Sequence, residues 1–311
     1  MSEAKVDYSR VARMSAGKAL VRRTLLLPWV NRAAVAVLGG LPDSAWRSRI
    51  PVARSATLQL DGAETLVLLR ADRCQVAKEV FWGAGRLRGA ADRLALDAVL
   101  RLCGGADLFL DIGAYTGLFA LSVARRVPGA VVHAYEIVPE NFMLLWDNVI
   151  ANDLVGRVEP RLVGLGESRA SLRVAASLGS GALASSVALD SESRGGVNVP
   201  VRTLDDLYAD FTGGAVFKID VEGFELEVLR GGRSFLSRVK PHMLCEVLTR
   251  TKNVAQTQAL LGSCGYRFYH VADRGLIPAE SIVAVQRERD WLFTTHDAQA
   301  LAALGLPVVK P

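Results

Sequence analysis

Apolar and polar positions along this chain follow two periods, and the switches between them divide it into elements. Short apolar runs alternate with stretches whose apolar residues stand three or four positions apart, which is typical of strands followed by helices. The predicted strands are residues 108–112, 131–135, 158–163, 216–220, 242–248 and 266–271. The predicted helices are residues 91–103, 118–126, 141–152, 222–231 and 256–261. This alternation predicts an α/β fold with a mostly parallel sheet and helices on both faces.

The N-terminal part follows a different pattern. Residues 1–50 predict a helical arm that is broken by proline and glycine. Residues 57–69 alternate around Asp61-Gly62, which is a strong signal for a β-hairpin. We therefore divide the chain into an N-terminal arm and hairpin at residues 1–90, a main domain at 91–290 and a C-terminal tail at 291–311.

Composition narrows the class of partner. The formal net charge is +5, which is mild for 311 residues. The sequence has no Lys/Arg run and no basic stripe interleaved with aromatics, so we expect no nucleic-acid partner. The four cysteines are widely spaced and form no CxxC pair, which indicates reduced thiols in a cytoplasmic protein.

The arm also allows a membrane interpretation. Arg22-Arg23 precede an apolar stretch, as in a twin-arginine export signal. Pro28 and Arg32 interrupt that stretch, so no clean run of about 20 apolar residues exists for a membrane span. We expect an arm that packs on the core or on a partner. The alternative is peripheral contact of residues 20–40 with the inner face of a membrane.

Acidic residues stand at the ends of four predicted strands. Asp111 lies in the first strand and Glu136 follows the second. Asp220 and Glu222 come at the end of the fourth, and Glu246 lies in the fifth. In an open parallel sheet, ligands bind beyond the carboxyl ends of the strands. These acids therefore mark the predicted site.

The loop after the first predicted strand indicates which ligand binds. A dinucleotide fingerprint needs G-x-G-x-x-G, but here the middle glycine is missing between Gly113 and Gly117, and Asp111 would repel a pyrophosphate. A ligand with a cationic end fits better, and S-adenosylmethionine carries an ammonium group and a sulfonium. Glu136 is positioned to accept hydrogen bonds from its ribose hydroxyls. The structural alternatives are a helix N-cap for Asp111 and a first-turn helix acid for Glu136.

Residues 216–231, Val-Phe-Lys-Ile-Asp-Val-Glu-Gly-Phe-Glu-Leu-Glu-Val-Leu-Arg-Gly, closely resemble the signature of the FkbM family of S-adenosylmethionine-dependent methyltransferases. The resemblance covers about residues 90–250, and its other segments are Phe-Leu-Asp-Ile-Gly-Ala-Tyr-Thr-Gly at 109–117, Ala-Tyr-Glu-Ile-Val-Pro-Glu-Asn-Phe at 134–142, Asn148 with Asn152, Thr-Leu-Asp at 203–205, Pro241, and Cys-Glu-Val at 245–247. Two positions depart from the family pattern. Ile137 replaces the proline after the ribose acid, and Tyr115 replaces an asparagine.

The resemblance implies a class I methyltransferase (Rossmann-like) fold, with the N-terminal helical and hairpin extension added to it. It implies methyl transfer from S-adenosylmethionine to a hydroxyl of a sugar, glycolipid or natural product. It also implies a set of cofactor contacts, namely Asp111, Gly113, Ala114, Tyr115, Gly117, Glu136, Ile137 and Asn141. Asp220, Glu222 and Glu246 would lie at the reacting end.

A neutral alcohol is a poor nucleophile, so a general base is expected to take its proton. Asp220 is the first candidate, because it ends the strand nearest the expected methyl group, and Glu222 is the second. His242 opens the fifth strand and is a third candidate, although a structural histidine is the alternative. Asp220, Glu222 and Glu246 offer hard oxygen ligands for Mg²⁺, but such carboxylates are common without metal, so we do not favour a required ion.

Several alternatives stay open. N-methylation of an amine or amide would need no strong base. A non-catalytic binding protein could keep the same fold, and a nicotinamide-dependent oxidoreductase is disfavoured by the missing glycine. Residues 176–200, rich in serine and glycine, predict either a surface loop or a lid over the site. Phe81 and Trp82 either stack on a sugar or belong to the core.

Overall fold

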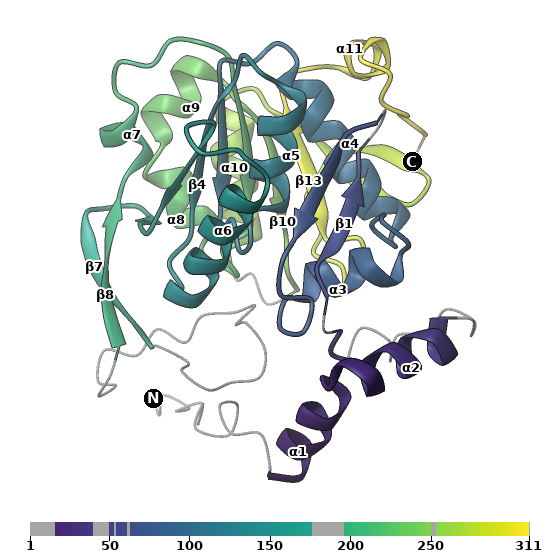
Figure 1. Ribbon diagram of the computed structural model, residues 1–311. Coiled ribbons are helices and arrows are strands. Elements are labelled where there is room, and N and C mark those ends of the chain that lie inside the picture. The colour runs from purple at the N-terminus through teal and green to yellow at the C-terminus, as the bar shows by residue number, and fades with distance from the viewer. Residues whose placement is uncertain are drawn as a thin grey trace, which may run out of the picture.

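The computed structural model describes residues 16–39, 50–52, 54–60, 63–175, 196–249 and 253–310. At its centre lies an eight-stranded sheet in the order β12-β11-β13-β10-β9-β3-β4-β5 (Figure 1). Its parallel strands are β3 (Leu108–Ile112), β4 (Val131–Tyr135), β5 (Val158–Arg161), β9 (Ala215–Ile219) and β10 (His242–Glu246). The remaining three are β11 (Arg267–Ala272), β12 (Gly275–Ala279) and β13 (Asp290–Thr294), with β13 antiparallel to both β10 and β11.

The strand order reverses in the middle of this sheet. From β3 the chain moves outward to β4 and β5, and it then returns to place β9 and β10 on the other side of β3. Such a reversal opens a crevice at the carboxyl ends of the strands, where doubly wound sheets bind ligands. The insertion of an antiparallel strand between β10 and β11 completes the arrangement of a class I methyltransferase. The predicted fold class is confirmed.

Helices cover both faces of the sheet (Figure 1). One face packs against α4 (Ala90–Cys103), α5 (Leu118–Arg126) and α6 (Pro139–Ala151), in a cluster that includes Phe109, Leu121 and Leu145. The other packs against α7 (Leu204–Leu207), α8 (Glu225–Arg230), α9 (Arg233–Val239) and α10 (Val254–Ser263), around Phe217 and Phe235. Because both faces are covered, the central strands are apolar on both sides, as in other parallel sheets.

The predicted hairpin forms from β1 (Ala56–Gln59) and β2 (Thr65–Leu68), which pair antiparallel; its predicted turn at Asp61-Gly62 lies outside the described residues. Asn148 of α6 and Asn152, which caps the C-terminus of that helix, attach the hairpin to the main domain. Asn152 Oδ1 accepts a hydrogen bond from Val67 N at 2.7 Å, and Asn148 Oδ1 accepts one from Leu69 N at 2.9 Å. The spacing of the two asparagines places both side chains on one face of the helix.

A helix that the sequence pattern did not reveal, α3 (Gln75–Trp82), follows the hairpin. Phe81 and Trp82 pack against the larger hydrophobic cluster, with their rings edge to face at 5.1 Å. Neither residue lines the cavity described below, so the core alternative for these two aromatics is the one that holds.

Residues 291–311 are not a tail, which corrects the predicted boundary. Strand β13 occupies an interior position in the sheet, and α11 (Ala298–Ala303) follows it. Val308 then bridges back to Leu276 of β12. The short run Trp291–Phe293 gains its strand character from β10 and β11, which are distant in sequence, so the local pattern gave little signal.

A three-stranded sheet stands beside the main one, formed by β6 (Gly164–Leu165), β7 (Ala170–Ala175) and β8 (Gly196–Arg202). Residues 196–200 of the predicted loop are part of β8 and therefore not loop. Residues 176–195 lie outside the described residues.

The predicted N-terminal arm is helical where it is described, with α1 (Ala16–Leu25) and α2 (Pro28–Gly39). In Figure 1 the arm lies outside the body, on the side where the parallel strands end. Within the described parts of the chain, no helix has the length and apolar character needed to cross a membrane.

Candidate functional site

A cavity of about 530 Å³ lies at the carboxyl ends of the parallel strands, next to the switch point between β3 and β9. The loop after β3, the starts of α3 and α6, and the small sheet supply most of its walls. Ten residues predicted from the sequence line it, namely Asp111, Gly113, Ala114, Tyr115, Glu136, Ile137, Asn141, Asp220, Glu222 and Glu246. The sheet therefore brings the acids of separate strands to one place, as expected.

Two predicted site residues do not line the cavity. His242 lies at the amino end of β10, the opposite end of that strand from Glu246. Its Nδ1 hydrogen-bonds Thr294 Oγ1 at 2.6 Å, and its ring lies 4.4 Å from that of His296. The prediction of His242 as a base is therefore wrong, because position in the strand places it at the wrong edge of the sheet.

Gly117 is the second exception, and its role is in packing. It precedes α5 with φ +88, a left-handed conformation that suits glycine. A Cβ at this position would lie 2.4 Å from Leu145 Cδ1 of α6. Gly117 lets α5 begin close to α6 and so shapes the loop without contacting the cavity itself.

Gly113 is where the loop after β3 crosses the end of β9. It has φ +80, and a Cβ on it would lie 1.8 Å from the Asp220 carbonyl oxygen. On the same side, Asp220 N donates a hydrogen bond to Ile112 O at 2.9 Å. This contact fixes the position of the loop after β3 relative to Asp220.

Gly113→Ala is expected to lower the free energy of unfolding by about 2 kcal/mol or more, because it adds a left-handed strain and an overpacked contact. Binding of S-adenosylhomocysteine should fall with it. Chemical denaturation and calorimetry measure the two effects. Gly105→Ala is the matched control, since no atom lies within 4 Å of a Cβ there. If Gly113→Ala and Gly105→Ala have equal stability and equal affinity, the close contact between Gly113 and the Asp220 carbonyl oxygen is contradicted.

Glu136 follows β4 and is buried. Its Oε2 accepts a hydrogen bond from Tyr115 N at 2.7 Å, and its Oε1 accepts one from Val138 N at 2.8 Å. Burial raises the pKa of Glu136 to about 7, although these backbone donors oppose the rise. Each carboxylate oxygen keeps a second acceptor site, so Glu136 can hold the loop and a ribose diol together.

Asp111 is buried at the floor of the cavity. Its Oδ2 accepts a hydrogen bond from Ala120 N at 2.9 Å, in the first turn of α5. Burial raises its pKa to about 7, while Ala120 and Lys218 act in the opposite direction. Asp111 therefore stabilises the helix start, as in the structural alternative, and still presents a carboxyl group to the cavity.

Lys218 is a cavity-lining residue that the sequence analysis missed. It is buried within β9, with Nζ 3.4 Å from Asp220 Oδ2 and 3.7 Å from Asp290 Oδ1. Burial alone would lower the pKa of Lys218, but Asp220, Asp290 and Glu246 outweigh it and raise the pKa. The available signal was one charged residue in an otherwise apolar strand, two positions before Asp220.

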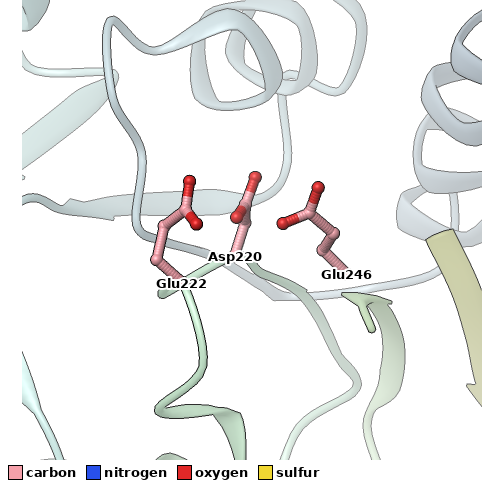
Figure 2. Close-up of side chains that lie close together, drawn as sticks. All are labelled: Asp220, Glu222 and Glu246. Carbon is pink, nitrogen blue, oxygen red and sulfur yellow. The ribbon is translucent and has the colours of Figure 1, made fainter. Parts of the chain in front are cut away.

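Asp220, Glu222 and Glu246 lie side by side, each with a carboxylate oxygen within 4.8 Å of the others (Figure 2). Burial and the neighbouring Asp220 raise the pKa of Glu246 to about 8. Burial acts upward on Asp220 too, but Lys218 and a hydrogen bond from Glu246 lower its pKa overall. At neutral pH, Asp220 is therefore ionised while Glu246 carries the proton.

Basic side chains already face this acidic group. Lys218 Nζ contacts Asp220, and Arg289 Nη1 lies 3.2 Å from Glu246 Oε1. The three carboxyl groups have the chemistry to hold Mg²⁺. However, Lys218 and Arg289 already place positive charge next to Asp220 and Glu246, where a metal ion would place it.

The turn after β9 assigns different roles to two neighbouring glutamates. The helix predicted from residue 222 begins at Glu225, whose Oε1 accepts hydrogen bonds from Gly223 N at 2.9 Å and Val221 N at 3.3 Å. Glu225 thus satisfies the backbone donors of the turn. Glu222 has φ +58, and its side chain lines the cavity.

Comparison with known proteins agrees with this geometry. The family described as "Methyltransferase FkbM domain" matches residues 111–268, slightly more than half of the chain. A segment of 104 residues is 32% identical to the 31-O-demethyl-FK506 methyltransferase FkbM of Streptomyces tacrolimicus, and covers 33% of this chain and 36% of that protein. A segment of 82 residues is 35% identical to a tRNA (guanine(37)-N(1))-methyltransferase of Batrachochytrium dendrobatidis, and covers 26% of this chain and 16% of that protein. The chain thus spans well under half the length of these relatives.

Among solved structures, a methyltransferase FkbM from Methylobacillus flagellatus is 18% identical, with a TM-score of 0.41 over 61% of this chain and 43% of that one. A SAM-dependent O-methyltransferase from Thermotoga maritima is 15% identical, with a TM-score of 0.37 over 65% of this chain and 63% of that one.

The strand order is that of the class I methyltransferase fold, and the acid-lined cavity lies at the carboxyl ends of its parallel strands. Within that class, the chain belongs to the FkbM methyltransferase family. The matched region contains every cavity-lining residue that was predicted from the sequence, from Asp111 to Glu246.

Proposed function

We propose that this protein transfers a methyl group from S-adenosylmethionine to a hydroxyl group of a sugar, glycolipid or natural product, with Asp220 as the general base. The observation that carries the proposal is the meeting of Glu136 and Asp220 in one cavity, each at the end of its own strand. One serves the cofactor and the other serves the acceptor.

The lining residues fit the cofactor. Glu136 is a buried acceptor for the ribose hydroxyls, and Ile137 and Val138 next to it offer apolar contact for the adenine. Asp111 and Asp220 give the other end of the cavity a negative character that suits the methionyl ammonium group. When bound, S-adenosylmethionine supplies the methyl group and leaves as a neutral thioether, so no acid is needed for the leaving group.

Asp220 is suited to the acceptor step. Its carboxylate is ionised at neutral pH, and its side chain is 37% exposed, so an acceptor can reach it. As the new carbon–oxygen bond forms, Asp220 takes the hydroxyl proton, while Lys218 and Glu246 hold the carboxylate in place. Orienting the acceptor oxygen in line with the methyl group supplies the other large part of the rate.

A hydroxyl-rich acceptor suits the outer part of the cavity. Phe224 lines it and is 46% exposed, which leaves an aromatic face on which a sugar can stack. Glu222 and Glu227 line the same part and offer carboxylate oxygens to hydroxyl donors. The FkbM relative is named for O-methylation of FK506, which supports an oxygen acceptor.

Calorimetric binding of S-adenosylmethionine tests the cofactor half of the proposal and should give a dissociation constant in the micromolar range. Affinity should rise with pH through about 7 and level off only above it, because burial raises the pKa of both Glu136 and Asp111 to about 7 and only their ionised forms suit the ligand. Glu136→Gln should weaken binding by about 1–3 kcal/mol and reduce the pH slope, leaving the part that belongs to Asp111.

The control for this measurement is Glu64→Gln, at an exposed glutamate that pairs with Arg126 outside the cavity. It should bind as the wild type does. Absence of binding by the wild-type protein, or a Glu136→Gln variant with unchanged affinity and pH slope, would refute the assignment of the cofactor site.

A further inference from the structure

The second helix of the N-terminal arm, α2, packs one face on the body and exposes apolar side chains on the other. Asn31 and Val35 face the body: Asn31 is buried and donates a hydrogen bond to Pro51 O at 3.1 Å, and Val35 packs against the main hydrophobic cluster. On the other face, Trp29 is 68% exposed and Val37 is 71% exposed. Residues spaced by four fall on one side of a helix, so Trp29, Ala33 and Val37 form one exposed stripe.

The arm exposes further apolar side chains outside α2. Leu27, between the two helices, is 45% exposed, and in α1 Leu20 is 66% and Val21 is 59% exposed. The described body of the chain leaves this surface, which we define as Leu20, Val21, Leu27, Trp29 and Val37, open to solvent.

The positive charge of residues 16–39 indicates an anionic partner for this surface. Residues 16–39 contain Lys18, Arg22, Arg23 and Arg32 and no acidic residue, in a chain whose formal net charge is +5. Arg23 and Arg32 are exposed, and together with the exposed tryptophan and aliphatic side chains they complement an anionic lipid surface. The apolar groups enter the acyl boundary and the basic groups meet the headgroups. Each of the two helices is too short to cross a bilayer, so the contact is peripheral.

The arm and the cavity face the same way. The cavity lies at the carboxyl ends of the parallel strands, and in Figure 1 α1 and α2 lie beyond that same end of the sheet. Gln75 and Val76, at the start of α3, line the cavity. A bilayer that receives the arm would therefore lie on the side of the molecule to which the acceptor must come.

We propose that residues 16–39 dock the protein on an anionic membrane surface with the cavity turned toward it, and that the acceptor is an amphiphile whose hydroxylated headgroup stands at that surface. The proposed docking rests only on the exposed and basic side chains of residues 16–39. The statement about the acceptor rests on the proposed function, because it assigns the methyl acceptor of the same cavity to a lipid-anchored class.

Vesicle flotation with the full chain tests the docking. The protein should float with vesicles of phosphatidylcholine and phosphatidylglycerol, and at least tenfold less with phosphatidylcholine alone. Leu27→Glu with Trp29→Glu should reduce the bound fraction at least tenfold, and so should Arg23→Glu with Arg32→Glu. The matched control is Met143→Glu with Trp146→Glu, which makes the same apolar-to-acid change at exposed positions of α6 and should leave flotation unchanged.

Three outcomes would overturn the docking: no flotation with anionic vesicles, equal flotation with neutral vesicles, or equal loss in the α6 control. Light scattering adds a further test, since a dimer that Trp29→Glu dissociates, without vesicle binding, would assign the surface to a second copy of the chain. Calorimetric binding of S-adenosylhomocysteine should be the same in all these variants. Failure of flotation with intact cofactor binding would therefore refute the membrane contact and leave the methyltransferase proposal standing.

Discussion

Asp220→Asn is expected to lower kcat by about two to four orders of magnitude, because an amide cannot take the proton of the acceptor hydroxyl. Binding of S-adenosylmethionine should change by no more than about threefold, since Glu136 and the loop after β3 stay in place. Transfer of a labelled methyl group to a panel of hydroxylated sugars, glycolipids and natural products measures the rate, and calorimetry measures cofactor binding.

Asp290→Asn is the control for this variant. Asp290 also contacts Lys218, but it does not line the cavity, so it tests whether any loss of activity comes through the lysine alone. The control should retain most of the rate. If both variants lose the same activity, the carboxylate of Asp220 positions Lys218 and is not the base. An Asp220→Asn enzyme with full activity on an amine would instead establish N-methylation, which needs no strong base.

Lys218→Met should lower the free energy of unfolding by about 3 kcal/mol. The substitution leaves Asp220 and Asp290 without the buried cation between them, and loss of one partner of a buried ion pair is strongly destabilising. The value lies at the lower end of the usual range because the Asp220 side chain is 37% exposed. Urea denaturation at pH 7 measures the change.

Lys310→Met, at an exposed position near the end of the described chain, is the matched control and should be neutral. A double-mutant cycle sharpens the test: Lys218→Met combined with Asp220→Asn should cost less than the sum of the single changes, because the second removes a charge that the first leaves unpaired. Strict additivity of the two changes would contradict a direct electrostatic contact between these side chains.

Much of the cavity lining was predictable because its residues lie at or just after the ends of strands. Asp111, Gly113 and Glu136 stand next to runs of apolar residues, and parallel strands bring such positions to one edge. Strand-end position placed every predicted acid at the cavity. His242 begins β10, so it lies at the opposite end of the strands. Position within a strand was the deciding information.

Elements that depend on distant partners were harder to predict. Strand β13 is short, and its neighbours β10 and β11 supply the pairing that makes it a strand. Glu225 accepts a hydrogen bond from Gly223 N in the turn before its own helix, which begins three residues later than the predicted start at 222. These are tertiary effects, in which contacts override the local pattern.

By itself, the sequence determined the class of fold, the family resemblance and the acids that line the cavity, because periodicity and strand-end position are local properties of the chain. Only the tertiary structure decided which groups those acids contact and which of them are ionised. It placed Lys218 between Asp220 and Asp290, brought Glu246 within hydrogen-bond reach of Asp220, and left Trp29 and Val37 of α2 exposed. The charge state of a carboxyl group and the exposure of a side chain depend on neighbours that are distant in the sequence. A local sequence pattern therefore cannot predict them.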